Sequence, residues 1–359
     1  MSRALALAER GRGRTSPNPM VGAVVVDRDG VVVGRGWHEA AGGPHAEVRA
    51  LADAGDRSRG STLYCTLEPC SHVGRTGPCA PLVVAAGIAR AVIAMEDSNP
   101  RVAGRGVAHL RAHGIEVTLG VLEERARRLN APFFTWVSRR RPFVTLKMAL
   151  TLDGCVSARP GARTALTGAA AARAVHRERA EVDAIAVGSG TVLTDDPLLT
   201  ARGAFRHRPL TRVVFDRRLA TPPGARLLST PGAGPVIIVS TAAARHTSSR
   251  AEELAHRGAH LEFIESDGSS AGFIAQALRR LAALDCTSLI VEGGPTLQAA
   301  FWEAKLVDRL EIFLAPWFAG PDGVPGPPLP IGTVAALDSR SARPLGEDVL
   351  IEGYVHRTD

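Results

Sequence analysis

Short apolar runs rich in Val and Ile alternate along this chain with Ala- and Leu-rich segments. In the first 140 residues, strands are predicted at 21–27, 31–36, 62–67, 90–95 and 115–119. Helices are predicted at 2–10, 44–54, 78–86, 104–113 and 121–129. Arg28-Asp29-Gly30 between the first two strands is typical of a hairpin turn. This alternation predicts an α/β layered sandwich.

The pattern starts again after Arg139-Arg140-Arg141-Pro142, which we take as a linker. Strands are predicted at 143–150, 183–187, 211–216, 236–240, 288–291 and 309–315. Helices are predicted at 167–180, 271–284 and 295–304, and Gly/Pro-rich loops at 222–235 and 320–330. We therefore expect two α/β domains, residues 1–141 and residues 142–359, which suits a chain of 359 residues.

Composition narrows the class of protein. With 45% hydrophobic residues and no long apolar run, the chain is expected to be globular, without a membrane span or signal peptide, and cytoplasmic. The net charge of +7 favours anionic partners, but the Arg residues are scattered, so small phosphorylated molecules are favoured over nucleic acid. Five Cys in this length do not form a disulfide framework, and we expect Cys65, Cys155 and Cys286 to be reduced.

One stretch carries the ligands of a metal site. It contains Pro44-His45-Ala46-Glu47, then Glu68-Pro69-Cys70, then Pro78-Cys79. His45, Cys70 and Cys79 supply three zinc ligands and leave the fourth tetrahedral position for water. Glu47, two residues after His45, is expected to move protons during attack of that water. These are the parts of a zinc-dependent hydrolytic deaminase.

The spacing of the two Cys separates classes of deaminase. Nucleic-acid and cytidine deaminases carry Pro-Cys-x-x-Cys, whereas eight residues separate Cys70 from Cys79 here. His72 and Arg75 lie in this insertion as polar groups suited to a phosphate or a ring carbonyl. The alternatives are a closed structural zinc site with His72 as fourth ligand, and an RNA-binding deaminase or module. The long insertion and the low aromatic content, 4%, disfavour RNA.

The second half has two glycine turns that suit a phosphate-bearing cofactor. Gly188-Ser189-Gly190-Thr191 and Glu292-Gly293-Gly294-Pro295-Thr296 each follow a predicted strand. Neither completes G-x-G-x-x-G, so the standard dinucleotide-binding fold is disfavoured. On these grounds alone, both remain equally consistent with ordinary tight turns.

These motifs resemble the bifunctional deaminase/reductase family of riboflavin biosynthesis. In the first 140 residues the resemblance rests on Asn18-Pro19, on Gly43 to Glu47, on Thr66 to Cys79, and on 97–106. It implies a cytidine-deaminase-like fold and deamination of 2,5-diamino-6-ribosylamino-4(3H)-pyrimidinone 5′-phosphate. It also implies that the pyrimidine is surrounded by Asn18, His38, His72, Arg75 and Asn99.

From about residue 141 to the end, the chain is similar to the reductase half of that family. The resemblance rests on Lys147 with Leu152-Asp153-Gly154, on Asp195-Asp196-Pro197, on the turn at Glu292, and on Ala315-Pro316. It implies a dihydrofolate-reductase-like domain in which NADPH reduces the ribosyl group to ribityl, and a homodimer or homotetramer. The implied substrate-binding residues are Lys147, Arg179, Leu199, Arg202 and Glu292. The implied cofactor-binding residues are Thr191, Asp195, Gly293, Gly294 and Thr296.

The second half departs from the family pattern at a few positions. Arg163 and Ala165 replace a Ser-x-Trp pair that touches substrate and cofactor in the family, and Cys155 replaces a basic residue. These changes keep open an alternative: a deaminase whose reductase domain is inactive or repurposed, acting on another aminopyrimidine in specialised metabolism.

Overall fold

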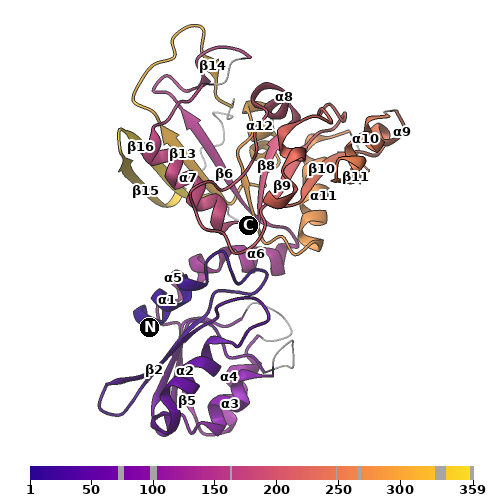
Figure 1. The fold of residues 1–359 in the computed structure, drawn as a ribbon. Coiled ribbons are helices and arrows are strands. Elements are labelled where there is room, and N and C mark those ends of the chain that lie inside the picture. Colours follow the sequence, from indigo (N-terminus) through magenta and orange to yellow (C-terminus); the bar gives the residue numbers. More distant parts are fainter. Residues whose placement is uncertain are drawn as a thin grey trace. The chain divides into compact units, whose positions relative to one another are not determined.

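The computed structural model describes residues 1–71, 77–97, 103–161, 164–247, 249–265, 268–327 and 337–355. The chain divides into two compact units, Met1–Arg140 and Arg141–Asp359. Each unit is an α/β structure built on its own central sheet (Figure 1).

The sheet of the first unit has the order β2-β1-β3-β4-β5. β1 pairs antiparallel with β2 and β3, whereas β3, β4 and β5 are parallel. The strands are β1 (Gly22–Val26), β2 (Val32–Trp37), β3 (Thr62–Cys65), β4 (Arg90–Ile93) and β5 (Glu116–Leu119). The helices are α1 (Ser2–Ala8), α2 (Ala46–Ala54), α3 (Cys79–Ala85), α4 (Arg105–Ala112), α5 (Glu123–Leu129) and α6 (Ala131–Arg139), with short 3₁₀ turns η1 (Glu9–Gly11) and η2 (Gly55–Ser58).

Helix α2 packs unusually close to β2 because two glycines face it. A Cβ atom on Gly34 would come within 2.2 Å of the Ala50 carbonyl oxygen, and one on Gly36 within 2.3 Å of the Ala46 oxygen. Ala46 and Ala50 are themselves fully buried in the core against β1. Small residues on both sides therefore fix the height of α2 on the sheet, and with it the position of the residues at the start of α2.

The sheet of the second unit has the order β11-β10-β9-β8-β12-β6-β13-β16-β15. It is parallel from β11 to β13, and β16 and β15 complete it in antiparallel pairing. Its strands are β6 (Phe143–Leu150), β8 (Ala184–Gly188), β9 (Thr211–Phe215), β10 (Val236–Thr241), β11 (Ala259–Ile264), β12 (Ser288–Val291), β13 (Arg309–Leu314), β15 (Leu337–Leu345) and β16 (Asp348–Val355). β7 (Cys155–Ser157) and β14 (Val324–Pro325) form a separate two-stranded ribbon.

Helices cover both faces of this second sheet, as expected for parallel strands. They are α7 (Ala169–Glu181), α8 (Ser189–Asp195), α9 (Ala242–Thr247), α10 (Arg250–His256), α11 (Ser270–Ala283) and α12 (Pro295–Glu303), with 3₁₀ turns η3 (Arg226–Ser229) and η4 (Pro231–Ala233). Alternate strand residues point to different cores: Ala186 packs in the core of α11 and α12, and its neighbour Val187 in the core of α8 and α10.

Several elements of the structure were not anticipated from the sequence pattern. Helix α6 extends to Arg139, the first residue of the predicted linker, and α8 begins within the glycine turn at Gly188 to Thr191. The pair β15–β16 closes one edge of the second sheet. Arg141, predicted to be part of a linker, is 7% exposed and forms two hydrogen bonds, of 2.5 and 2.7 Å, to Asp308. This pair joins the beginnings of β6 and β13.

Candidate metal centre and reductase pocket

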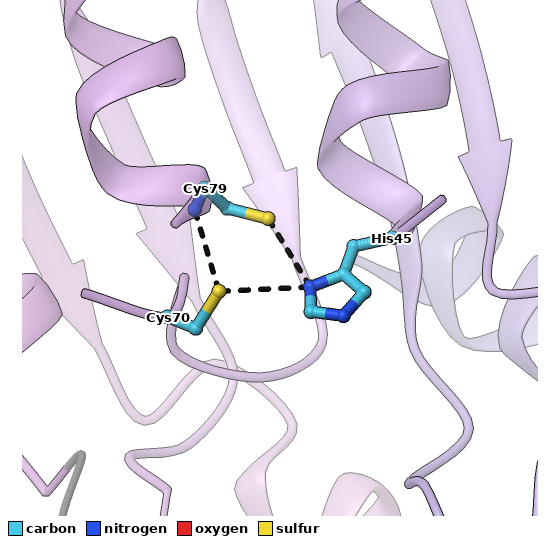
Figure 2. Close-up of side chains that lie close together, drawn as sticks. All are labelled: His45, Cys70 and Cys79. Atoms are coloured by element: carbon cyan, nitrogen blue, oxygen red, sulfur yellow. Dashed lines mark hydrogen bonds between the residues drawn. The ribbon is translucent and has the colours of Figure 1, made fainter. Parts of the chain in front are cut away.

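Three metal-ligating side chains of the first unit converge at one point. The Nδ1 atom of His45 lies 3.6 Å from Cys70 Sγ and 3.3 Å from Cys79 Sγ. Figure 2 shows the imidazole edge facing both sulfur atoms, with dashed lines to each. One nitrogen and two sulfurs within 4.8 Å of one another match the ligand set of zinc with an open fourth position.

The positions of these ligands follow from the ends of local elements. His45 is the N-cap residue of α2, and Cys79 is the first residue of α3. Cys70 lies in the loop after β3, where its sulfur accepts a 3.3 Å hydrogen bond from the Cys79 backbone N–H. The Cys79 thiol, together with the His45 ring, lowers the pKa of Cys70 to about 4. A thiolate is the form that binds metal.

Glu47 is a buried carboxyl beside the candidate ligands. It lies in the first turn of α2 and is 4% exposed. Burial raises the pKa of Glu47 to about 6. A carboxyl group with a pKa this close to neutral can both accept and release a proton, which is the chemistry required of a deaminase carboxylate.

Asn18 and His38 approach the same centre from the loop before β1 and from the end of β2. The Asn18 side-chain nitrogen lies 3.1 Å from His38 Nε2, and His38 Nδ1 lies 3.2 Å from the Pro44 carbonyl oxygen. His38 is 2% exposed, and its ring meets the His45 ring edge-on with centroids 5.5 Å apart. Of the remaining substrate residues expected here, His72, Arg75 and Asn99 lie outside the described residues.

Two buried polar residues that the sequence reading missed organise this site. Glu68 is 3% exposed and accepts hydrogen bonds from the backbone N–H groups of Asp97, Gly104 and Val107. Asn130 is 2% exposed and binds the N–H and the C=O of Met20, two residues after Asn18. Glu68 could have been suspected from the sequence, because it is a charged residue directly after Leu67 at the end of a predicted strand. Nothing in the sequence around Asn130 indicates its role.

The second unit brings three predicted substrate residues into one charged cluster. Arg179 on α7 donates two hydrogen bonds, of 2.7 and 2.8 Å, to the Glu292 carboxylate at the end of β12. Lys147 Nζ on β6 lies 3.8 Å from the same carboxylate. Burial opposes ionisation of Glu292, but the Arg179 charge outweighs it and holds the pKa of Glu292 below its usual value. The cluster therefore presents a fixed carboxylate with two cations around it.

Two further predicted substrate residues lie on the loop after α8. Leu199 is buried and has a positive φ of 53°, and the Arg179 guanidinium donates a 3.1 Å hydrogen bond to the Thr200 carbonyl. The backbone N–H of Arg202 donates to His176 Nδ1 at 3.1 Å. Helix α7 thus holds this loop through Arg179 and His176.

Two of the predicted cofactor residues, Thr191 and Gly294, meet beyond the ends of the parallel strands β8 and β12. The backbone N–H of Gly294 donates a 3.2 Å hydrogen bond to Thr191 Oγ1, which joins the start of α12 to α8. Gly293 follows β12 directly, and Thr296 is exposed in the first turn of α12. Asp195 is the last residue of α8. Crevices at the carboxyl ends of adjacent parallel strands are where such sheets bind nucleotides.

Cys155 and Ala165, two positions that depart from the family pattern, lie among the described residues. Cys155 is a free, buried thiol at the start of β7, and Ala165 is exposed. Arg163 lies outside the described residues. Among the described helices, none is long and apolar enough to cross a membrane.

Comparison with known proteins assigns both halves of the chain. Residues 1–95 match the cytidine and deoxycytidylate deaminase zinc-binding region, and residues 142–351 match the RibD C-terminal domain. These matches confirm the predicted fold class of a deaminase domain followed by a reductase domain.

The full-length relatives carry one name. The riboflavin biosynthesis protein RibD of Aquifex aeolicus is 40% identical over 98% of this chain and 96% of its own length. RibD of Escherichia coli is 40% identical over 90% of this chain and 88% of its own. The structure of Acinetobacter baumannii RibD is 34% identical, covers 99% of this chain and 98% of its own, and has a TM-score of 0.86.

Another similar solved structure is described by two enzymatic activities. A diaminohydroxyphosphoribosylaminopyrimidine deaminase/5-amino-6-(5-phosphoribosylamino)uracil reductase from Thermotoga maritima is 34% identical to this chain. It covers 99% of this chain and 97% of its own, with a TM-score of 0.81.

Proposed function

The chain belongs to the RibD family of riboflavin-biosynthesis proteins, and we propose from its geometry how each of its two sites takes part in the two reactions of that family. It is a bifunctional enzyme, a zinc-dependent deaminase joined to an NADPH-dependent reductase. The first unit deaminates 2,5-diamino-6-ribosylamino-4(3H)-pyrimidinone 5′-phosphate. The second reduces the ribosyl group of the product to a ribityl chain. Similarity along both halves does not favour the alternative of a repurposed second domain.

The deaminase assignment is supported above all by His45, Cys70 and Cys79 converging beside a buried Glu47. These three residues hold the zinc ion, which, when bound, makes a water molecule nucleophilic at neutral pH. Glu47 would take one proton from that water as its oxygen bonds to the amino-bearing ring carbon, and would deliver it to ring N1, which receives the C=N electron pair. The remaining hydroxyl proton would pass through Glu47 to the amino nitrogen as the carbonyl forms, the C–N bond breaks and ammonia leaves.

The pyrimidine is held by residues around this centre. Asn18 and His38, whose side chains lie 3.1 Å apart, contact the ring. His72, Arg75 and Asn99 complete the substrate site in this proposal. Arg75 is suited to the substrate phosphate because a guanidinium group binds phosphate oxygens through paired donors.

In the second unit, NADPH, when bound, supplies the hydride that reduces C1′ of the sugar. Thr191, Asp195, Gly293, Gly294 and Thr296 contact the cofactor. The positively polarised N-terminal end of α12, which has nine residues, suits its phosphates.

The ribose phosphate of the substrate is bound by the charged cluster around Glu292 and by the loop after α8. Arg179 and Arg202 supply the cations, Leu199 packs against the substrate, and Glu292 accepts a hydrogen bond from it. Hydride addition and ring opening at C1′ require one proton. We assign this proton to Lys147, because its Nζ atom lies 3.8 Å from the carboxylate of Glu292, the proposed substrate contact.

Both half-reactions are tested on the purified, zinc-loaded protein, with the diaminopyrimidinone ribotide given with and without NADPH. We expect ammonia release in both cases and NADPH oxidation only after deamination. Glu47→Gln should lose the first step and still oxidise NADPH with the deaminated product. Ammonia release without NADPH oxidation would mean that the second unit is inactive as a reductase or catalyses another reaction. No ammonia, with zinc in place, would refute the deaminase assignment.

We further propose that the enzyme works in the cytoplasm on small phosphorylated substrates, without nucleic acid, as a homodimer or homotetramer. The scattered positive charge and the bacterial biosynthetic relatives support this location and substrate size. Light scattering of the purified protein at micromolar concentration would reveal a monomer if the oligomer proposal is wrong.

A further inference from the structure

A carboxyl group lies on the face of α7 that packs against the second sheet. The small apolar core on this face consists of Ala171 and Val175 of α7 with Phe313 of β13 and Leu350 of β16. Glu178 follows Val175 by three residues and Ala171 by seven, so the helical period places it on the same face. An ionisable residue in an otherwise apolar stripe breaks the local pattern, and such exceptions are expected at functional or strained sites.

The nearest polar partners of Glu178 are themselves mostly acidic. Glu311 of β13 is 2% exposed, and in the sheet it lies directly opposite Glu352 of β16. Arg309 Nη2 lies 2.6 Å from an oxygen of each of these two carboxylates, and Arg309 Nη1 lies 3.6 Å from Glu178. Among the described residues, Arg309 is the only cation in an ion pair with Glu178 or Glu311. One guanidinium group is therefore shared by three carboxyl groups.

The other charged groups around this cluster have partners of their own. Lys147 of β6 and Arg179 of α7 both contact the Glu292 carboxylate at the end of β12. Arg343 of β15 lies 3.9 Å from Glu352, and its side chain is 49% exposed. If every carboxyl group of the cluster is ionised, three carboxylates face two guanidinium groups, and one negative charge is left without a counter-charge in a largely buried place.

One oxygen atom of the cluster indicates where a proton is bound. The buried Glu311 Oε2 atom accepts no hydrogen bond from an N–H group of the described residues, whereas Glu311 Oε1 contacts Arg309. The Glu178 carboxyl group lies within hydrogen-bonding reach of Glu311. Two carboxylates this close do not both ionise readily, but a protonated one can donate to the other. Burial, and then the contact with Glu311, raise the pKa of Glu178 well above its usual value.

We propose that Glu178 carries a proton at neutral pH and donates it in a hydrogen bond to Glu311, and that this shared proton holds the last turn of α7 against β13 and so positions Arg179. Arg179 is the next residue of the helix, and it binds the Glu292 carboxylate and the Thr200 carbonyl. When the proton leaves, Glu178 and Glu311 repel each other, and Arg179 loses its fixed position. The pair thus weakens the substrate pocket as the pH rises. Its link to that pocket rests on the proposed reductase function.

The direction of the pH dependence follows from where the proton is bound. The unfolded chain releases the proton of Glu178 near the usual pKa of 4.5, whereas the folded chain keeps it to higher pH. Stability from the shared proton is therefore fully present below pH 4.5 and is lost as the pH rises through the folded-state pKa of Glu178.

Denaturant unfolding at several pH values measures this loss. Glu178→Gln keeps an N–H donor for Glu311 but does not titrate. From about pH 6 to 8, the unfolding equilibrium constant of the wild type should rise at least about threefold relative to that of the variant, and at most about tenfold per pH unit. Glu252→Gln on the exposed side of α10 is the control and should follow the wild type. Parallel profiles for the wild type and Glu178→Gln would overturn the proposal.

Infrared spectroscopy detects the proton itself. At neutral pH, the difference spectrum between the wild type and Glu178→Gln should contain the C=O stretch of a protonated carboxylic acid. The absence of this band would overturn the proposal. Neither this measurement nor the unfolding experiment depends on turnover, so both decide on the shared proton even in a protein that oxidises no NADPH.

The pH profile of KM tests the positioning of Arg179. With the deaminated product supplied directly, the KM of the wild type should rise about threefold or more relative to that of Glu178→Gln between about pH 7 and 9. Ammonia release by the first unit is the internal control and should have the same profile in both proteins. Parallel KM profiles would overturn the positioning role. A protein that oxidises no NADPH at any pH would refute the reductase function instead.

Discussion

Glu68 provides the sharpest test of how the deaminase site is held together. Its carboxylate is buried and accepts backbone N–H groups at 3.2 Å (Asp97), 3.0 Å (Gly104) and 3.0 Å (Val107). The last two donors lie at the start of α4. A Glu68→Gln substitution keeps one acceptor oxygen and places an amide N–H₂ against the other donors.

The cost follows from the number of buried donors left unpaired. Each buried N–H without a partner costs about 1–3 kcal/mol, and the glutamine leaves up to two. We expect the first unit to lose about 2–4 kcal/mol, which for a unit of this size lowers its melting temperature by roughly 6–12 °C. Ammonia release should fall as well, because Glu68 lies two residues from Cys70 and anchors the neighbouring segment.

Calorimetry on the full chain measures this effect, and we expect the two compact units to unfold in separate transitions. Glu96→Gln is the matched control: Glu96 is exposed, lies close in sequence, and should change the melting temperature by less than about 1 °C. NADPH oxidation with the deaminated product should be unchanged in both variants. A Glu68→Gln protein that melts like the control, with full zinc content, would refute this reasoning.

Further expectations concern both active sites. Glu47→Gln should retain zinc and lower ammonia release by about 10²–10⁴-fold; zinc analysis and an ammonia assay check this. A chelator should abolish ammonia release and spare NADPH oxidation, which activity before and after zinc restoration would decide. Glu292→Gln should leave Arg179 without its bidentate partner and lower NADPH oxidation about 100-fold, with deamination as the internal control. Burial, Arg179 and Arg202 lower the pKa of His176, so folding stability should fall as the pH drops below the unfolded-state value of about 6.5. His176→Asn keeps an acceptor for the Arg202 backbone N–H but does not titrate. In denaturant titrations, its free energy of unfolding should therefore fall less below pH 6.5 than that of the wild type.

The sequence alone determined the parts of this protein that depend on spacing and alternation. The intervals between His45, Glu47, Cys70 and Cys79 identified a zinc deaminase, because those residue types have few other uses in that pattern. Alternating apolar runs predicted two α/β units, since strands buried on both faces must be apolar. The glycine turns suited a phosphate-bearing cofactor, but from the sequence pattern alone they were equally consistent with ordinary tight turns.

Only the tertiary structure decided the groups that act through distant partners. Glu68 and Asn130 hold loops by hydrogen bonds to backbone atoms, and backbone acceptors and donors leave no trace in the sequence. The strand pair β15–β16 was missed because β15 is mostly exposed and lacks an apolar pattern. The contacts of His38 with Asn18, 20 residues earlier in the chain, and with the Pro44 carbonyl are likewise formed only on folding.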